Sequence, residues 1–593
     1  MAARVMDVTT PVSNFAAQES PTLPGREEHG SIGVPVRSAN VDHSPTEDTV
    51  FHRLARAWFA VRWRLAETIF AKPIPWATAN LELKLGDLVV TLPVAVAFLA
   101  WNARLCAKQE VKESGAAPSL MMMLVFALTV RNNSILLSLT GLPYERALLY
   151  HKFFGIIAIL VAGLHGFAYL LEDTGVAVAR RQRRRLAAMA TTTTRTYTYK
   201  EPMFSEQLSG AIIFYMLIAL FVLSLSIVRR RYFEFFLRTH WLLFIGIVVF
   251  SVVHGAGLVL VGAGVWAIDM VFRHAYVAPK YWKGSVASTK RMGVLVREQI
   301  SIAKLPGDIV RIQFLKIRAD TGECFHYEAG QYVFVCVPKL GYLEWHPFTI
   351  SSSPHEALVT IHIKALGGWT KRLLQQAGIA SAGASTVPAP FTILFDGPYG
   401  QVSLDIASLK TYSHFALFSG GIGITPMQAI ANQLHYEYHN EGRHAIKKVR
   451  FVWSVRDRAT IQAMFSRGFV DSKKQLLGLD HQAPYLPDLL LSSTTSNEAR
   501  DVFVTEFFLT KEQREADNPV DEQLQRCLRY STRPQIKDTL RSLGEDAKQA
   551  SKSRVAVLVC GPAAMVKEVV SEAIRLSNEM KIHFDVHTES FDF

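Results

Sequence analysis

Cysteine is scarce in this sequence and is poorly placed for cross-linking or metal binding. The 593 residues include five cysteines, none in a CxxC pair: Cys106, Cys324, Cys336, Cys527 and Cys560. This spacing excludes a disulfide scaffold and the usual cysteine sites for zinc or iron–sulfur clusters. Any redox cofactor must therefore be held by other residues.

Charged residues are also few. They make up 19% of the chain, against 49% hydrophobic residues, and the mean hydropathy is +0.16. These values exclude full disorder and a purely soluble enzyme, yet leave enough charge for aqueous domains. The net charge of +13 is typical of membrane proteins with basic cytoplasmic loops, so we expect membrane lipid and no nucleic acid as a partner.

The first 80 residues carry no long apolar run. Residues 1–50 mix Pro, Ser, Thr, Gly and charge without periodicity and lack the apolar core of a secretory signal. We expect a disordered tail there. Over 51–80, apolar residues recur at three-and-four spacing with arginines between them, which predicts a basic amphipathic helix on a membrane surface. An ordinary helix packed on a soluble domain is the alternative.

Long hydrophobic segments then predict a membrane domain over 85–276. Six occur, at 85–104, 119–140, 151–171, 209–228, 240–257 and 258–273, and several reach the ~20 residues that span ~30 Å of hydrocarbon. With six spans, the basic loop at 229–231 lies on the same face as the basic segments before and after the membrane domain. The positive-inside rule places this face in the cytosol. The loop at 172–208 conflicts with this topology, because it carries five arginines between 180 and 185 yet falls outside.

Histidines in two spans indicate a cofactor. His151 and His165 lie in the third span, and His240 and His254 in the fifth, each pair 14 residues apart. Fourteen residues are close to four helical turns, so each pair faces one side of its helix with a rise of ~21 Å. Two such helices side by side would offer two stacked His–His sites, which suit low-spin electron-transfer haems.

The topology places His151 and His240 at an inner haem and His165 and His254 at an outer one. For a single histidine, a hydrogen-bonded or interfacial helix residue is the alternative. Glycines beside the outer pair would leave room for a flat macrocycle, or would serve close helix packing; they are Gly163, Gly166, Gly255 and Gly257.

After residue 288 the sequence predicts two further domains. Short β-rich runs at 310–317, 331–337 and 358–363 predict a small antiparallel barrel over 288–400. From 410 to 593, strand, Gly-rich turn, helix and strand follow one another, which indicates a parallel nucleotide-binding α/β domain. A polar stretch around 465–500 is expected to form an insertion in it.

Several motifs in these domains suit nucleotide binding. The turn at 367–370 opens a helix whose backbone N–H groups would hold a phosphate. The Gly-rich turn at 420–426 would let a pyrophosphate approach a helix N-terminus, although tight strand-to-helix turns use the same residues. Arg456, after the next strand, would bind a 2′-phosphate and so favours NADPH over NADH. Cys560 would lie near a nicotinamide, or is a buried small residue.

Together these residues resemble the ferric reductase and NADPH oxidase superfamily, over 85–593. The two histidine pairs, HPFT at 346–349, GPYG at 397–400, GGIGITP at 420–426, CGP at 560–562 and an aromatic end occur in the family's order. The resemblance implies a multi-domain membrane protein: an α-helical six-span haem bundle, then a β-barrel FAD-binding domain and an α/β nucleotide-binding domain. It implies FAD, two b-type haems and NADPH as cofactors.

The resemblance also implies site residues. Those for FAD are His346, Pro347, Phe348, Thr349, Gly368, Trp369 and Thr370, with Gly397 and Pro398 in the turn that ends the barrel. Those for NADPH are Gly420, Gly421, Gly423, Thr425, Pro426, Arg456, Cys560, Gly561 and Pro562. An aromatic residue at the end would cover the flavin or merely close a core; Phe591 matches oxidases, and Phe593 is more similar to ferric reductases.

A hydride carries two electrons and a bis-histidine haem accepts one, so a flavin must separate them. We therefore expect electrons to pass from cytosolic NADPH through FAD and two haems to a ferric chelate across the membrane, expected to be the plasma membrane. The spacing of 14 in both pairs resembles ferric reductases, since oxidases tend to shorten the second pair by one. Dioxygen, giving superoxide, is the alternative acceptor.

Other possibilities carry less weight. Copper(II) would share the acceptor site, and a ferrous-iron transporter is a conceivable partner that no motif identifies. The sequence has no EF-hand pattern, which argues against one class of regulated oxidase. A non-enzymatic membrane scaffold would be expected to lose cofactor residues, and none of the main ones is missing.

Overall fold

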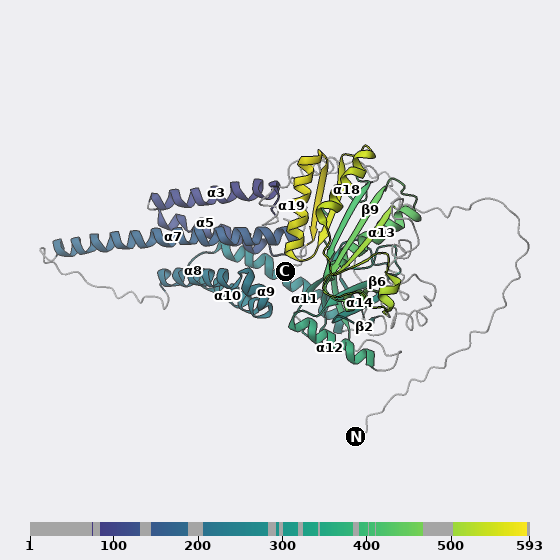
Figure 1. Ribbon diagram of the computed structural model, residues 1–593. Helices are drawn as coiled ribbons and strands as arrows, with labels where there is room; N and C mark the ends of the chain where they lie inside the picture. Colours follow the sequence, from purple (N-terminus) through teal and green to yellow (C-terminus); the bar gives the residue numbers. More distant parts are fainter. Residues whose placement is uncertain are drawn as a thin grey trace, which may run out of the picture. The chain divides into compact units, whose positions relative to one another are not determined.

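A computed structural model describes residue 74 and the ranges 83–108, 110–130, 144–187, 205–282, 292–295, 300–317, 324–341, 344–382, 391–400, 402–408, 411–465, 502–516 and 518–589 (Figure 1). Four predicted features lie outside these residues: the tail at 1–50, nearly all of the amphipathic segment at 51–80, the insertion around 465–500, and the aromatic residues Phe591 and Phe593. They stay predictions.

The first described part is helical. Its helices are α3 (Leu85–Ala107), α4 (Val111–Ser114), α5 (Ala116–Ala127), α7 (Tyr144–Ala187), α8 (Glu206–Leu223), α9 (Ser226–Arg231), α10 (Phe233–Val253) and α11 (Leu258–Trp282). Among the described residues, α3, Arg146–Leu171 of α7, α8 and α10 are long and apolar enough to cross a membrane, and α11 has a shorter apolar stretch, Leu258–Val271. Four of the six predicted spans are therefore confirmed by length and composition.

The third span differs from its prediction at its far end. The sequence predicts a loop from residue 172, but α7 continues as a helix to Ala187. The loop prediction is wrong for 172–187, because the stretch holds no proline and is rich in Ala and Arg, which favour helix. The extension adds roughly 24 Å of helix at 1.5 Å per residue.

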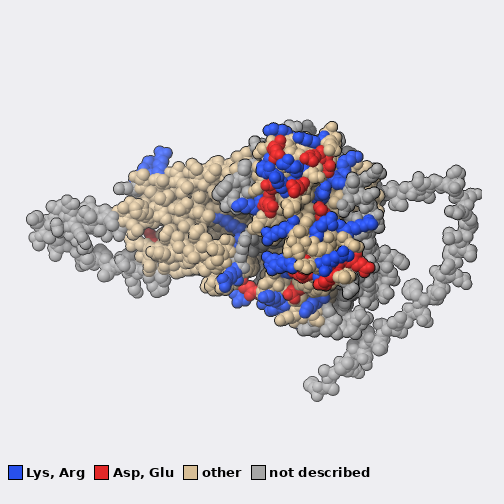
Figure 2. Space-filling model, viewed as in Figure 1, with Lys and Arg blue, Asp and Glu red and all other residues tan. Residues whose placement is uncertain are grey.

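The membrane helices bury small and aromatic side chains between them. Phe244 of α10 packs edge-on against Phe126 of α5 at 4.9 Å and against Trp266 of α11 at 4.9 Å between ring centroids. Large apolar side chains such as Leu242 and Ile268 are exposed, as expected where lipid replaces water. Figure 2 shows the charged side chains gathered over the C-terminal domains, with few on the visible face of the helical part.

The predicted barrel consists of two antiparallel sheets. One has the order β1 (Met292–Leu295), β7 (Ile393–Tyr399), β4 (Tyr332–Cys336), β5 (His346–Thr349), and the other β2 (Ser301–Leu305), β3 (Ile309–Leu315), β6 (Leu358–Lys364). The helix α12 (Gly368–Ala382) contributes Trp369, Leu373 and Ala377 to the core between them. The strands predicted at 310–317, 331–337 and 358–363 occur as β3, β4 and β6.

The last domain has a six-stranded parallel sheet in the order β11 (Leu528–Tyr530), β10 (Phe503–Leu509), β9 (Lys448–Val455), β8 (His414–Gly420), β12 (Arg554–Cys560), β13 (His583–Glu589). Alternate residues of β8 face opposite layers. Phe415 and Leu417 pack with α13 (Ile424–His439) and α14 (Arg458–Phe465). Phe418 packs with α18 (Ile536–Gln549) and α19 (Ala563–Met580), on the other face (Figure 1).

The order of these strands locates a binding crevice. From β8 the chain adds β9, β10 and β11 on one side, and then returns to add β12 and β13 on the other. Ligands of doubly wound sheets bind at the carboxyl ends of the strands where the order reverses. The turn at 420–426 follows β8 and the turn at 560–562 follows β12, so both predicted nucleotide motifs lie at this point.

Candidate functional site

The four predicted histidines meet in pairs across α7 and α10. The ring centroids of His151 and His240 are 6.4 Å apart, and those of His165 and His254 are 6.1 Å apart. Two metal–nitrogen bonds of about 2 Å each, with the short offset from each ligating nitrogen to its ring centre, separate two imidazole centroids by about 6 Å. Both pairs therefore fit a metal ion held between two imidazoles.

Hydrogen bonds orient three of these rings. The Nδ1 atoms of His151 and His254 lie 2.9 Å from the carbonyl oxygen of Val125 and 2.8 Å from that of Glu206. A carbonyl only accepts, so each Nδ1 carries the proton and Nε2 keeps its lone pair for a metal. His165 Nδ1 lies 2.8 Å from Ser114 Oγ. These partners lie on other helices, and sequence reasoning missed them.

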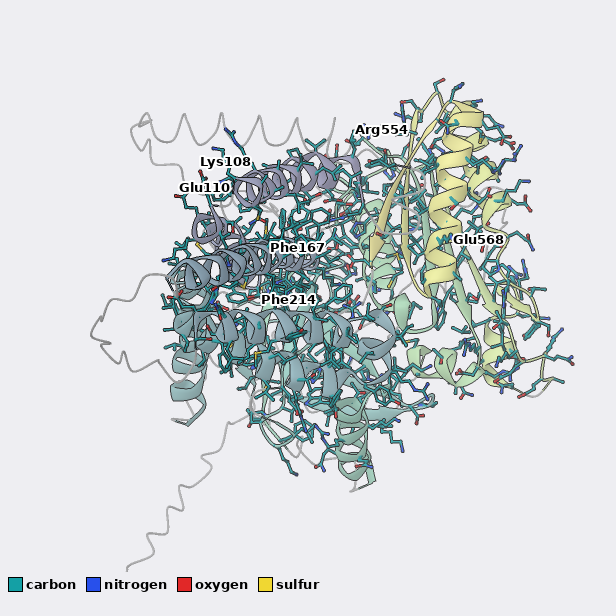
Figure 3. The ribbon with its side chains drawn as sticks, turned by 90° about the vertical axis from the view of Figure 1, so that its left-hand side faces the viewer. Lys108, Glu110, Phe167, Phe214, Arg554 and Glu568 are labelled. Carbon is teal, nitrogen blue, oxygen red and sulfur yellow. The ribbon has the colours of Figure 1, made fainter. Side chains whose placement is uncertain are left out.

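The glycines that pack against the rings of the outer pair, His165 and His254, are not the predicted ones. A Cβ added to Gly210 would lie 2.7 Å from His254 Cε1, and one added to Gly115 would lie 3.3 Å from His165 Cε1. Gly163 instead faces Phe214, as expected for helix packing. Figure 3 labels Phe214 on α8. Gly166, Gly255 and Gly257 are exposed and have no other described atom within 4 Å of such a Cβ, so close packing between the described helices does not explain them.

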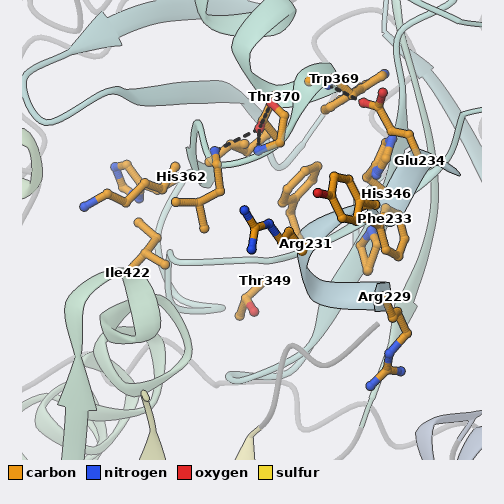
Figure 4. Close-up of a pocket in the computed structure, with 18 of the residues that line it drawn as sticks. Arg229, Arg231, Phe233, Glu234, His346, Thr349, His362, Trp369, Thr370 and Ile422 are labelled. Atoms are coloured by element: carbon orange, nitrogen blue, oxygen red, sulfur yellow. Dashed lines mark hydrogen bonds between the residues drawn. The ribbon is translucent and has the colours of Figure 1, made fainter. Parts of the chain in front are cut away.

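A cavity of about 820 Å³ lies between the barrel and the membrane helices (Figure 4). It is lined by all of the HPFT strand, by the turn at 367–370, and by Ile422 and Thr425 of the Gly-rich turn. Its other wall is the junction of α9 and α10, which includes Arg229, Arg231 and Glu234. Sequence analysis assigned the arginines there only to topology, because their proximity to the barrel depends on tertiary contacts.

Aromatic stacking and unpartnered polar atoms suit this cavity to a planar polar ligand. The His346 ring lies 4.4 Å from that of Trp369, between centroids, and Phe348 stacks on Trp369 at 5.9 Å. Burial lowers the pKa of His346 to about 4, so the ring is neutral near pH 7. Within the described part of the chain, His346 Nε2 and Trp369 Nε1 are buried without a hydrogen-bond partner. These atoms fit the polar edge and phosphates of a flavin nucleotide.

The Gly-rich turn serves two purposes. A Cβ on Gly420 would overlap Pro562, and one on Gly423 would overlap the carbonyl oxygen of Cys560, so both glycines let this turn pack against the turn at 560–562. Gly421 differs: its φ is +55° and a Cβ there would meet no other described atom within 4 Å. Trp453 Nε1 holds the turn by donating to the Gly421 carbonyl at 2.9 Å. Gly421 is thus the glycine left open to a phosphate.

Most of the remaining predicted residues are buried or packed within the fold, and one is exposed. Cys560 is 1% exposed, and burial raises the pKa of its thiol well above the usual range, so the thiol stays protonated. Pro426 is buried in the first turn of α13. Gly397 and Pro398 lie within β7, away from the cavity lining, where a Cβ on Gly397 would press on Val333. Arg456 is exposed beyond the end of β9.

Family comparisons agree with this sequence of domains. Three family models match in order: "Ferric reductase like transmembrane component" over 114–252, "FAD-binding domain" over 294–403 and "Ferric reductase NAD binding domain" over 412–574. The chain belongs to the ferric reductase and NADPH oxidase superfamily. The predicted fold class is thereby confirmed: a membrane helical domain followed by FAD-binding and nucleotide-binding domains.

Relatives within the superfamily are distant. Dual oxidase 1 of Homo sapiens is 27% identical over 390 residues, which is 65% of this chain and 23% of that protein. NADPH oxidase 1 of Mus musculus is 29% identical over 282 residues, 42% of this chain and 45% of that protein. The chain thus spans about a quarter of the dual oxidases. A flavohemoglobin structure from Malassezia yamatoensis with bound FAD and heme aligns over 82% of this chain and 98% of that chain, with 15% identity and a TM-score of 0.33.

Membership in the superfamily establishes the cofactor classes. The chain carries a transmembrane domain of a haem-binding family, followed by FAD-binding and nicotinamide-nucleotide-binding domains. The two histidine pairs fit haem, and the cavity with its unpartnered His346 and Trp369 nitrogens fits FAD. When bound, these groups supply hydride acceptance and one-electron transfer, while the protein supplies their placement.

Proposed function

We propose that this chain passes electrons from cytosolic NADPH through FAD and two haems to a ferric chelate on the opposite face of the plasma membrane. One NADPH and two ferric ions would give NADP⁺, one proton and two ferrous ions. The observation that carries the proposal is the spacing of the histidine rings. They meet in two pairs, one at each end of the helices, with 6.4 and 6.1 Å between ring centroids.

The cavity supports the direction of this route. Residues 233–235, which line it, precede His240 on α10 by five to seven positions, or roughly 8–10 Å along the helix. The flavin would therefore lie on the side of His151 and His240, and His165 and His254 would lie toward the acceptor. With the interior negative, outward electron movement is favoured by ~2.3 kcal/mol per 100 mV.

The acceptor separates two candidate functions. The equal spacing of 14 in both histidine pairs favours ferric iron. The names of the relatives, dual oxidase and NADPH oxidase, favour dioxygen with superoxide as the product. His165 and His254 would together hold the outer haem, which would then supply single electrons to either acceptor without binding it.

The test of the acceptor uses the full chain in membranes with FAD and NADPH. Ferrous iron is followed with a chelating dye, with and without superoxide dismutase, in air and anaerobically. We expect iron reduction that survives both the dismutase and the removal of oxygen. Reduction that needs oxygen and vanishes with the dismutase would replace ferric reduction with superoxide production.

Arg456 is expected to select NADPH. Its side chain is exposed at the carboxyl end of β9, where the ribose of a nucleotide in a doubly wound sheet lies. Loss of a charge-assisted bond to a 2′-phosphate costs about 1.5–3 kcal/mol, so Arg456→Ala should raise the KM for NADPH by about 10-fold to 100-fold. The KM for NADH should change less than about twofold. The rate of flavin reduction measures both.

The matched control for this substitution is Arg526→Ala, which removes another exposed arginine of the same domain. It should leave both KM values unchanged. An equal rise in the KM for NADPH and for NADH in Arg456→Ala would contradict the assignment of the 2′-phosphate to this residue.

A further inference from the structure

Glu234 makes a contact between the membrane helices and the barrel. Its carboxylate Oε1 accepts a hydrogen bond from the backbone N–H of Trp369 at 3.0 Å (Figure 4). The two residues are 135 positions apart in the chain. Glu234 belongs to the first turn of α10, and Trp369 to the first turn of α12. The bond therefore ties a membrane helix to the turn that lines the flavin cavity.

The charge of Glu234 suits this position. Each helix carries about half a positive charge at its N-terminus, and a carboxylate near it is stabilising. Glu234 lies at two such ends at once, since it is in the first turn of its own helix and accepts from the first turn of α12. The carboxylate thus holds two helix N-termini together that would otherwise repel each other.

Gly368 permits the contact. A Cβ added to this residue would lie 2.5 Å from Glu234 Oε1 and 3.2 Å from its Cδ. The carboxylate could not approach the Trp369 N–H past such an atom without moving. Gly368 therefore leaves room for this contact, since a Cβ there would force the end of the Glu234 side chain to turn away from the Trp369 N–H. The sequence did not indicate this role.

The same helix leads to the inner histidine pair. His240 is six residues after Glu234 on α10, roughly 9 Å along the helix, and its ring lies 6.4 Å from that of His151. On the barrel side, Trp369 stacks with His346 and Phe348 of the HPFT strand. The contact of Glu234 with Trp369 thus connects the elements that hold the flavin to the helix that holds the inner haem.

We propose that Glu234 is a positioning residue that docks the turn at 367–370 onto α10 and thereby sets the rate of electron transfer from FAD to the inner haem. The inference rests on the proposed route through flavin and haem, and it is independent of the final acceptor. Electron transfer slows steeply with distance, so loosening this contact should slow that step. Hydride transfer from NADPH, which takes place within the two C-terminal domains, should slow much less.

The test uses the full chain in lipid nanodiscs, loaded with FAD and haem, in anaerobic stopped-flow experiments with NADPH. Flavin bleaching and haem reduction are followed separately, and the dissociation constant of FAD is measured by its fluorescence. Glu234→Leu removes the acceptor at similar volume. Glu234→Gln keeps an oxygen that can accept from Trp369, and Glu568→Leu removes an exposed carboxylate of α19 as a matched control.

In Glu234→Leu, at saturating FAD, we expect haem reduction to slow about tenfold or more and to become slow relative to flavin bleaching in the same mixing experiment. Glu234→Gln should recover most of the rate, and Glu568→Leu should equal wild type. Gly368→Ala should also slow haem reduction. Both substitutions disrupt the same contact, between Glu234 and the Trp369 N–H. Haem reduction in the double variant Glu234→Leu with Gly368→Ala should therefore be no slower than in the slower single variant.

Three results would overturn the proposal. Haem reduction at the wild-type rate in Glu234→Leu would show that the contact does not control the step. A tenfold weaker FAD affinity would make Glu234 part of the flavin site instead. Additive effects in the double variant would mean that the two residues act separately. Absence of haem reduction in the wild type would overturn the proposed electron route itself, so the two failures are distinguishable.

Discussion

The substitution His165→Ala should abolish electron transfer across the membrane while leaving NADPH oxidation by the flavin intact. His165 and His254 face each other at 6.1 Å between ring centroids, and a b-type haem with one axial imidazole removed is expected to be lost or to change spin state. The remaining pair is ~21 Å away along the helices. We expect reduction of an impermeant ferric chelate to fall about a thousandfold or more, equivalent to about 4 kcal/mol in the barrier.

The haem content of the purified protein and its absorption spectrum measure the loss of the outer haem. Chelate reduction in sealed vesicles measures the loss of electron transfer across the membrane. His583→Ala is the control, because it removes an exposed histidine of β13. Flavin bleaching by NADPH should match wild type in both variants. Two haems per chain and unchanged chelate reduction in His165→Ala would refute the assignment of the outer haem.

The second large effect is expected for Gly423→Ala. A Cβ at this position would overlap the carbonyl group of Cys560, and its next contact would be Cys560 Sγ at 3.0 Å. The obstacle is backbone in a parallel sheet, where Ser419 of β8 is opposite Cys560 of β12, so it cannot rotate away as a side chain would. The Gly-rich turn must shift, and with it Gly421, Thr425 and the start of α13.

A shift of about 1 Å at a reacting site costs about a hundredfold in rate. We therefore expect hydride transfer from NADPH to fall about a hundredfold in Gly423→Ala, with FAD and both haems retained. Flavin bleaching and cofactor content are the measurements. The control is Gly378→Ala in α12, because a Cβ there would meet only the flexible Lys304 side chain, with its Cδ at 3.4 Å. Hydride transfer at the wild-type rate in Gly423→Ala would contradict the steric argument.

Local patterns predicted much of this molecule. The period of 3.6 residues per turn was enough to place His151 with His165 on one face and His240 with His254 on another, and the structure pairs them as expected. Short β-rich runs predicted β3, β4 and β6 of the barrel. The strand, turn and helix order after residue 410 predicted a parallel sheet, because consecutive strands joined by helices pack in parallel.

Other features escaped sequence analysis because they depend on residues far apart in the chain. Ser114, Val125 and Glu206 orient histidines on other helices, and no local pattern marks them. The sequence pattern predicts the end of α7 too early, because the basic residues after 171 mark a change of environment and not a change of secondary structure. Both kinds of error arise where tertiary packing or continued helix propensity outweighs the local hydrophobic pattern.

The fold class, the histidine spacing and the order of the cofactor motifs follow from local sequence patterns, since each depends on short-range periodicity or on a few adjacent residues. The use made of individual residues depends on tertiary contacts. Those contacts show that a Cβ at Gly423 would overlap the Cys560 carbonyl and that one at Gly421 would meet no other described atom within 4 Å. They also show that the Glu234 carboxylate accepts a hydrogen bond from the Trp369 N–H. The physical reason is that steric exclusion and hydrogen bonding act between neighbours in space, and the fold brings those neighbours together from distant parts of the chain.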